Sequence, residues 1–209
     1  EEFPLLVKYI DAREILSVQV HPDDEYARKN HNSNGKNEMW YIIDAEKNSE
    51  IVYGFKENIN KDIFIKHLNN SCLTEILNFI EVEEGDVFFI PARKLHAIGK
   101  GILLAEIQQS SDLTYRVYDW NRVDLDGSKR ELHTDLALDV LDFEKSATEK
   151  PKFQQKLNSS TNLVSSSFFD VNILWFENEI ERDYNNIDSF IIYMCVDGGC
   201  DITCKDTKT

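Results

Sequence analysis

Short apolar runs separated by polar turns fill the first 143 residues of the chain. Most of these runs have the length of a β-strand and stop too soon to make a helix. The strand-like runs are Leu5–Ile10, Ile15–His21, Lys36–Ile43, Val87–Ile90 and Ile102–Gln108. Two of them end directly before a proline, Pro22 and Pro91, which has no backbone N–H to give to a sheet. The pattern predicts a fold that is mainly β.

Helical spacing of the apolar residues is confined to a few short segments. Asp23–Lys29 begins with acidic residues, which the helix dipole favours at that end. The other predicted helices are one that is capped by Asn60 and runs through Leu68, a second at Leu73–Phe79, and a third at Asp135–Phe143. We therefore expect a small helical insertion at about residues 55–80 within the β fold.

The length of 209 residues allows one large domain or two small ones. Residues 1–143 carry the strand-like runs, whereas 144–165 is rich in Lys, Gln, Ser, Thr and Asn and is interpreted as a linker or mobile segment. Strand-like runs resume at Val171–Phe176 and Phe190–Cys195. We therefore predict one domain over 1–143 and the start of another over 166–209.

The chain is acidic, with 38 Asp and Glu against 23 Lys and Arg and a formal net charge of −15. Such a charge repels phosphate backbones at long range, so nucleic acid is not an expected partner. An anionic substrate then has to be held by a few basic groups placed locally.

No apolar run is long enough to span a membrane and no segment has the order of a signal peptide, so we expect no membrane partner and a cytoplasmic location. Nothing in the pattern bears on the oligomeric state.

The four cysteines fit a reducing compartment. Cys72 is isolated, while Cys195, Cys200 and Cys204 follow the spacing Cys-x4-Cys-x3-Cys. This spacing lacks the Cys-x2-Cys pair of structural zinc sites. We interpret the cysteines as reduced thiols on strands, and a metal site is the second, less favoured interpretation.

The stretch from Gly85 onward joins a buried strand to a histidine. Gly85 starts a tight turn into the run Val87–Ile90, Pro91 ends that run, and His96 follows in a short polar loop. The spacing Gly-x5-Pro-x4-His permits two interpretations. The histidine is a metal ligand offered by a small β-barrel, or it lies at the tip of an ordinary hairpin.

Polar side chains share faces of several predicted strands, because residues two apart in a strand point the same way. They are Ser17, Gln19 and His21 on one strand, Lys36 and Glu38 on the next, and Glu106 and Gln108 on a third. The first set either faces solvent or lines a polar cavity, and the second can be an ordinary ion pair. The carboxylate among the aliphatic residues of the third strand is costly to bury unless it is paired or binds a metal.

Four segments carry a resemblance in their order along the chain: Ser17–Pro22, Gly35–Met39, Gly85–Gly101 and Ala105–Trp120. Together they resemble the type I mannose-6-phosphate isomerases, zinc enzymes of the cupin superfamily, and the resemblance runs from Leu5 to about Phe143. It implies a cupin-type jelly-roll β-barrel followed by the start of a second cupin barrel. The family also has an N-terminal segment ahead of Glu1 and a finished second barrel, so we expect this chain to be a piece of a longer protein.

The chain departs from the general cupin motif at two positions. Arg93 stands where the motif has glycine, so the turn there can have a different geometry. The His-x-His of the motif is Gln-x-His here, at Gln19 and His21. The second departure fits the isomerases rather than the metal-dependent cupin oxygenases.

The resemblance also implies a metal site and a set of catalytic groups. The metal ligands of the family carry over onto Gln19, His21, Glu38 and His96, which would hold one Zn²⁺ ion per chain with a position open for substrate. The other active-site groups correspond to Lys36, Glu106, Asp112 and Arg116, and the expected substrate-binding residues are Ser17, Lys36 and Arg116.

The implied reaction interconverts mannose 6-phosphate and fructose 6-phosphate by moving a proton between C1 and C2 through a cis-enediolate. Arg116 is expected to grip the phosphate or to stabilise the enediolate, with Lys36 assisting at either position. Glu106 is the expected general base, and Asp112 is a weaker candidate that helps to open the sugar ring.

Three alternatives stay open. Arg116 can simply pair with Asp112 or Asp119. The barrel can bind a sugar phosphate without turning it over, as a sensor or regulator. It can also be a non-haem iron oxygenase, because His21, Glu38 and His96 could form a two-histidine, one-carboxylate triad.

Overall fold

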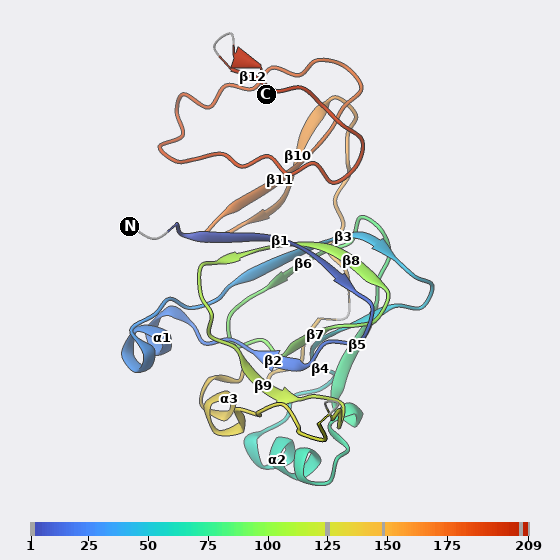
Figure 1. Ribbon diagram of the computed structural model, residues 1–209, viewed down its shortest axis with the longest axis vertical. Helices are drawn as coiled ribbons and strands as arrows, with labels where there is room; N and C mark the ends of the chain where they lie inside the picture. The colour runs from blue at the N-terminus through green and yellow to red at the C-terminus, as the bar shows by residue number, and fades with distance from the viewer. Residues whose placement is uncertain (1–2, 124–125, 148, 205–206, 209) are drawn as a thin grey trace.

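Two antiparallel sheets face each other in a computed structural model of the chain, which describes residues 3–123, 126–147, 149–204 and 207–208 (Figure 1). The four-stranded sheet has the order β1-β8-β3-β6, with β1 at Leu5–Ala12, β8 at Ile102–Gln109, β3 at Glu38–Ala45 and β6 at Val87–Ile90. The five-stranded sheet has the order β5-β4-β7-β2-β9, with β5 at Leu77–Glu81, β4 at Glu50–Phe55, β7 at His96–Ile98, β2 at Val18–Val20 and β9 at Tyr115–Tyr118. The chain crosses between the sheets at nearly every connection, which is how a jelly roll is wound. The prediction of a mainly β, jelly-roll barrel is confirmed.

Two helices lie over the outer face of the five-stranded sheet (Figure 1). The helical elements are α1 (Asp24–His31), α2 (Lys61–Asn69) and α3 (Thr134–Val140), with a 3-10 turn, η1, at Leu73–Glu75. Phe64 of α2 and Val140 of α3 belong to the same buried cluster as Phe55 of the sheet. α2 begins where the sequence predicts, because the side chain of Asn60 accepts a hydrogen bond from the backbone N–H of Ile63 at 2.9 Å.

The two sheets enclose an interior that is apolar at one end and polar at the other. The apolar end is a buried cluster drawn from both sheets, including Trp40, Ile42, Ile51, Ile98, Ile102 and Leu104. Alternate residues of β3 and β8 point inward, so these two strands continue from Ile42 and Leu104 into Glu38 and Gln108. The polar end is therefore built from the same strands as the apolar core.

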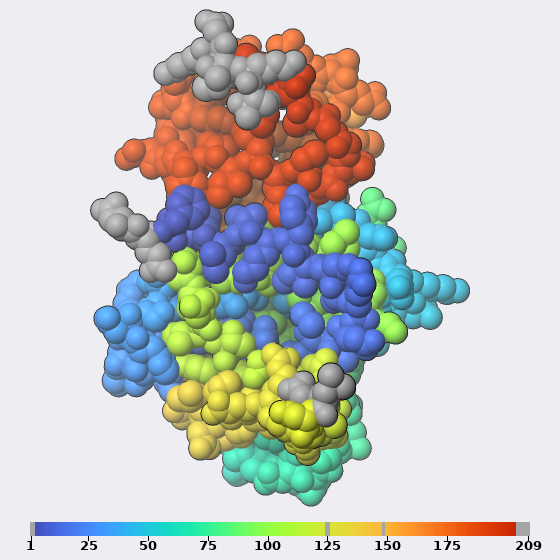
Figure 2. Space-filling model, viewed as in Figure 1, coloured from blue at the N-terminus to red at the C-terminus, as the bar shows by residue number. Residues whose placement is uncertain are grey.

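The outer face of the four-stranded sheet packs against a hairpin from the C-terminal part of the chain. β10 (Ser159–Ser165) and β11 (Asp170–Trp175) pair antiparallel. Val164 and Phe169 of this part are buried in one cluster with Met39 of β3. Figure 2 shows the C-terminal part, in orange and red, lying directly against the dark blue N-terminal strand.

The predicted helix at Leu73–Phe79 is wrong. Its end belongs to β5, which pairs with β4 along Leu77–Glu81 and buries Leu77 and Ile80. The side chain of Asn78 donates to the carbonyl of Tyr53 at 3.1 Å and fastens the strand further. Periodicity cannot separate a short strand from a short helix, and here the sheet pairing decides. The insertion at about 55–80 thus contains α2 and η1 but ends as a strand.

Other boundaries differ as well. The segment 144–165 contains β10, which forms because β11 pairs with it. Phe190–Cys195 lies in no strand of the described chain, although the sequence predicts one. α3 ends at Val140 instead of Phe143, because Leu141 is extended with ψ 131°. The division into domains is not tested by these elements and stays a prediction.

Cys72, Cys195 and Cys200 are free thiols, but they lie outside the strands, contrary to the prediction. Cys204 ends the short strand β12 (Thr203–Cys204), which pairs with β13 (Thr207–Lys208), and its side chain is outside the described part of the chain. Among the described residues, none of the helices has the length and apolar character that crossing a membrane requires.

Candidate metal centre

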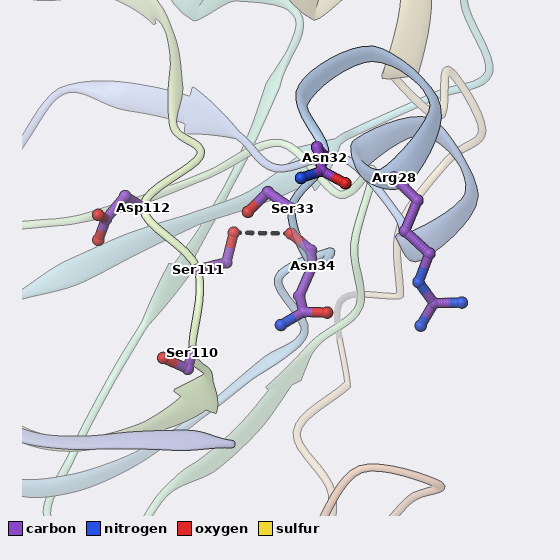
Figure 3. Close-up of a pocket in the computed structure, with 7 residues that line it drawn as sticks. All are labelled: Arg28, Asn32, Ser33, Asn34, Ser110, Ser111 and Asp112. Atoms are coloured by element: carbon purple, nitrogen blue, oxygen red, sulfur yellow. Dashed lines mark hydrogen bonds between the residues drawn. The ribbon is translucent and has the colours of Figure 1, made fainter. Parts of the chain in front are cut away.

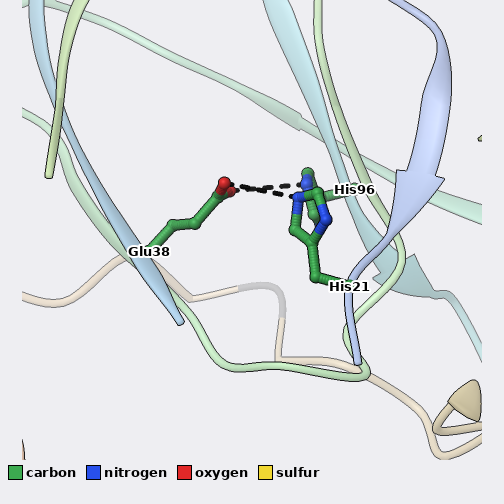
Figure 4. A group of neighbouring side chains, drawn as sticks. All are labelled: His21, Glu38 and His96. Atoms are coloured by element: carbon green, nitrogen blue, oxygen red, sulfur yellow. Dashed lines mark ion pairs between the residues drawn. The ribbon is translucent and has the colours of Figure 1, made fainter. Parts of the chain in front are cut away.

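Three side chains from different strand ends meet at the polar end of the barrel interior (Figure 4). Glu38 is the first residue of β3, His96 is the first of β7, and His21 directly follows β2. The prediction that His96 lies in a polar loop is wrong, because the residue already pairs with Gln19 of β2 and Tyr53 of β4. The strand ends bring together side chains that are far apart in the sequence.

The predicted metal ligands are close together and shielded from solvent. The donor atoms of His21, Glu38 and His96 all lie within 4.8 Å of one another, and each residue is at most 1% exposed. Glu38 Oε1 is 3.3 Å from His21 Nε2, and Glu38 Oε2 is 3.5 Å from His96 Nε2. Gln19 is half-buried, with its Nε2 3.4 Å from His96 Nε2. The structure therefore brings all four predicted ligands together.

Both imidazoles are oriented by backbone carbonyls. His21 donates from Nδ1 to the carbonyl of Leu113 at 2.8 Å, and His96 donates from Nδ1 to the carbonyl of Lys94 at 2.8 Å. Each ring therefore keeps its proton on Nδ1 and turns the lone pair of Nε2 toward Glu38. Histidines that bind metals are usually held in this way.

Several buried polar atoms of the centre have no hydrogen-bond partner among the described residues, namely Nε2 of His21 and both carboxylate oxygens of Glu38. Lys36 Nζ lies 3.1 Å from Glu38 Oε1 and balances one charge, as the predicted ion pair requires. An unpaired buried polar atom typically destabilises a fold by ~1–3 kcal/mol. A divalent cation would satisfy all of these atoms at once, and imidazole with carboxylate is a donor set that suits Zn²⁺. The residues present fit a metal ion.

The electrostatics of the centre favour the protonation states that bind metals. Burial alone would raise the pKa of Glu38, but His21, His96 and Lys36 outweigh burial and hold that pKa below its ordinary value. Burial lowers the pKa of His96 to about 4, against the opposing attraction of Glu38. At neutral pH the Glu38 carboxylate is therefore ionised and the His96 ring is neutral, the forms in which each donates to a metal.

Arg93 supports this centre through its backbone. Its φ of 75° lies in the left-handed region that glycine adopts readily. The turn therefore has a backbone conformation that suits the glycine of the motif, although an arginine occupies the position. The N–H of Arg93 donates to the carbonyl of His21 at 2.7 Å, and its side-chain Nε donates to the carbonyl of Val140 at 3.0 Å. The turn therefore joins the end of β2 to α3.

Arg116 extends the site along the five-stranded sheet. In the strand register, His96 of β7 and Arg116 of β9 both pair with Gln19 of β2, so the three side chains share one face of the sheet. Two strand spacings, about 10 Å in all, separate His96 from Arg116. The Nε of Arg116 donates to Ser17 Oγ at 3.2 Å, which joins two of the three predicted substrate-binding residues.

Positive charge gathers around Arg116. Burial lowers its pKa, and the neighbouring Arg130 and Arg122 lower it further, while Asp119 and Glu131 act in the opposite sense. Asp119 forms its ion pairs with Arg122 and Arg130, the latter at 3.6 Å, instead of the simple pair with Arg116 that the sequence also allows. A chain of net charge −15 thus concentrates cations at one place beside the polar end of the barrel.

Comparisons of the sequence and of the fold with known proteins agree on one family. Residues 1–66 match the family model for the phosphomannose isomerase type I catalytic domain. Over 170 residues the chain is 45% identical to a mannose-6-phosphate isomerase of Streptococcus mutans, covering 81% of this chain and 54% of that relative. The crystal structure of the mannose 6-phosphate isomerase from Bacillus subtilis superposes with a TM-score of 0.74 at 38% identity, covering 81% of this chain and 55% of that one. The chain is similar to the type I phosphomannose isomerases.

The similarity to phosphomannose isomerases covers part of those proteins. A second relative, mannose-6-phosphate isomerase ManA of Bacillus subtilis, is 40% identical over 174 residues, which is 82% of this chain and 55% of ManA. The chain therefore spans about half the length of the curated relatives that it matches. The cupin-type jelly roll of the family agrees with the strand order described above.

Glu106, the predicted general base, is held by two donors. Lys8 Nζ lies 3.0 Å from one carboxylate oxygen, and Trp40 Nε1 lies 3.0 Å from the other. Trp40 also packs edge-on against His96, with ring centroids 5.5 Å apart. Glu106 is thus connected to the metal centre through one indole ring. Lys8 and Trp40 were not predicted, although Lys8 shares a strand face with Leu6 and is a charge in an apolar stripe.

Asp112 lies apart from the metal centre. It is exposed and lines a polar surface pocket of about 330 Å³ (Figure 3). The other lining residues are Arg28, Asn32, Ser33, Asn34, Ser110 and Ser111. No member of the His21, Glu38 and His96 group lines this pocket. The role of Asp112 in ring opening stays a prediction without support from the geometry.

Proposed function

We propose that this chain carries the metal-binding and substrate-binding part of a mannose-6-phosphate isomerase, a zinc-dependent aldose-ketose isomerase. The observation that carries the proposal is the convergence of two buried imidazole nitrogens and one buried carboxylate, of which His21 Nε2 and both oxygens of Glu38 have no hydrogen-bond partner among the described residues. Similarity to relatives that are named mannose-6-phosphate isomerases supports the choice of substrate.

One Zn²⁺ per chain would be held by His21, Glu38 and His96, with the amide of Gln19 as the fourth ligand. When bound, the ion supplies Lewis-acid stabilisation of negative charge on sugar oxygens. The protein fixes the ligands for this purpose, because the carbonyls of Leu113 and Lys94 set both imidazoles before any ion arrives. A metal in this place would also remove the penalty of the unpaired buried atoms.

The phosphate of the substrate is assigned to Arg116 and Ser17, which already contact each other. The planar guanidinium suits a phosphate, since it can donate two parallel hydrogen bonds. Arg122 and Arg130 strengthen the local positive potential. This concentration of charge offsets the repulsion that a strongly acidic chain exerts on an anionic sugar.

The proton transfer between C1 and C2, through a cis-enediolate, is assigned to Glu106 with Lys36 in support. Both oxygens of Glu106 accept a hydrogen bond, so the carboxylate has a fixed orientation and can receive a proton in a defined position. Lys36 is buried beside Glu38 and can donate to a sugar oxygen at the metal centre. Asp112 is kept as a weaker candidate for opening the sugar ring.

A coupled assay that follows fructose 6-phosphate formation from mannose 6-phosphate, with and without chelator, tests the proposal. Turnover that chelation abolishes and Zn²⁺ restores is the expected result. Turnover that resists chelation would remove the metal from the reaction. Binding without turnover would instead favour the sensor or regulator, and iron in the purified protein would favour the oxygenase.

The remaining proposals concern the protein around the site. Residues 166–209 are proposed to begin a second cupin barrel; β11 lies in this range and pairs with β10 of the preceding segment. We also propose a sugar phosphate as the small-molecule partner, a cytoplasmic location, and no nucleic acid or membrane partner. The proposed activity and the acidic charge of the chain support these proposals.

A further inference from the structure

A second group of metal-ligand side chains lies outside the barrel, where α2 ends and η1 begins. It consists of His67, Cys72 and Glu75, whose donor atoms all lie within 4.8 Å of one another. His67 and Cys72 are half-buried, and Glu75 is exposed. The proposed isomerase reaction uses none of these residues, and they are on the opposite side of the five-stranded sheet from the metal centre.

The backbone between these residues is fixed by its own hydrogen bonds. Ser71 has a φ of 56°, which turns the chain back on itself after α2. The N–H of Cys72 then donates to the carbonyl of His67, and the N–H of Glu75 donates to the carbonyl of Cys72, both at 3.0 Å. The thiol, the imidazole and the carboxylate are therefore presented together by one short, ordered segment.

The imidazole of His67 has the orientation seen in the barrel. Its Nδ1 donates to the carbonyl of Ile63 at 2.8 Å, so its Nε2 carries a free lone pair. That Nε2 lies 3.9 Å from Glu75 Oε2. The Glu75 side chain is 69% exposed, and an ion pair this long and this exposed contributes little to stability. Ion pairing alone therefore does not account for the grouping.

We propose that His67, Cys72 and Glu75 form a peripheral site for a borderline divalent metal such as Zn²⁺. Thiolate, imidazole and carboxylate are the three ligand types that zinc accepts, and three protein ligands leave one position for water. On binding, the thiol gives its proton to the solvent and the sulfur coordinates the metal. The chain would then hold two ions instead of one, and only the peripheral ion would have a sulfur ligand.

Co²⁺ replaces Zn²⁺ in such sites and reports a sulfur ligand through thiolate-to-metal charge-transfer absorption. Apo-protein is titrated with Co²⁺ while this absorption is recorded. The barrel ligands contain no sulfur, so Glu38→Gln should keep the absorption even though it damages the barrel centre. Failure of the proposed isomerase function therefore leaves this result untouched.

The expected result is charge-transfer absorption that saturates at one thiolate-bound Co²⁺ per chain and is lost in Cys72→Ser. The matched control Cys195→Ser, which removes an exposed thiol elsewhere, should keep it in full. His67→Gln retains the thiol and should weaken Co²⁺ binding at this site by about tenfold or more. Absence of the absorption, its survival in Cys72→Ser, or unchanged affinity in His67→Gln would each overturn the proposal.

Discussion

The two halves of the barrel interior are built from the same strands and differ in what those strands bury. On β3 and β8, the paired residues Ile42 and Leu104 are fully buried in the apolar half. Four residues further along the inward faces, the pair is Glu38 and Gln108, which are equally buried. The difference teaches that the same two strands bury an apolar core at one end of the barrel and the proposed metal ligand Glu38 at the other.

The energetic contrast between the halves is large. Burying a large aliphatic side chain such as Leu104 contributes roughly 1.5–3 kcal/mol. A buried polar atom without a hydrogen-bond partner, such as Glu38 Oε2, works against folding by roughly 1–3 kcal/mol. Stability therefore comes mainly from the apolar half, and the proposed metal ion would offset the cost of the polar half.

Glu38→Gln is expected to have the largest effect. The amide is close to the carboxylate in size but carries no charge to hold a divalent ion, so turnover should fall by about 10³-fold, the upper end for loss of one preorganised electrostatic group. The measurement is kcat of the Zn²⁺-loaded protein, with Glu57→Gln on the exposed surface as the matched control. Equal rates for the two variants would contradict the role of the polar half.

Leu104→Ala tests the apolar half. Truncation of this fully buried leucine should lower the free energy of unfolding by ~2–5 kcal/mol, because a cavity is left between the sheets. Urea titration provides the measurement, and Val123→Ala, at a side chain that is 59% exposed, should change the free energy by less than ~0.5 kcal/mol. A small effect at Leu104 would mean that this half is not the main source of stability.

Lys8→Met examines the boundary between the halves. It removes one of the two donors to Glu106 while keeping a long apolar side chain. Lys8 is 40% exposed, so the free energy of unfolding should fall by only about 1 kcal/mol, whereas kcat should fall by about tenfold as Glu106, the proposed general base, loses its orientation. If stability fell and kcat stayed constant, the contact would be structural only.

Arg93 gives the smallest predicted effect. At its positive φ a side chain with Cβ is strained and glycine is not, so Arg93→Gly should be more stable than Arg93→Ala by about 1 kcal/mol. Both variants lose the same guanidinium contacts, which makes the pair its own control. Equal unfolding midpoints would show that the turn holding the carbonyl of His21 is unstrained.

Much of the barrel could be predicted because its strands have continuous apolar runs. Val87–Ile90 agrees residue by residue, and β1, β3 and β8 agree to within a few residues. β7 and β5 could not be recognised, since β7 is very short and the apolar spacing of β5 also fits a helix. These strands form by pairing with β4, a long-range contact that local sequence does not encode.

The ligand residues of the site could be predicted from the sequence, but the groups that orient them could not. Gln19, His21, Glu38 and His96 carry motif spacing, and the resemblance to one family selects them. The carbonyls of Leu113 and Lys94 have no such signal, because every residue has a carbonyl and only the fold decides which one meets an imidazole. Trp40 is indistinguishable in sequence from a core residue, yet it links Glu106 to His96.

The central claim is that the polar half of the barrel exists to bind one divalent cation. Anomalous diffraction at the zinc edge, from crystals grown with Zn²⁺, tests it most directly. The account predicts a peak about 2.0–2.1 Å from Nε2 of both His21 and His96, with Glu38 at a similar distance. A barrel interior without a peak, under conditions in which the protein is active, would contradict it.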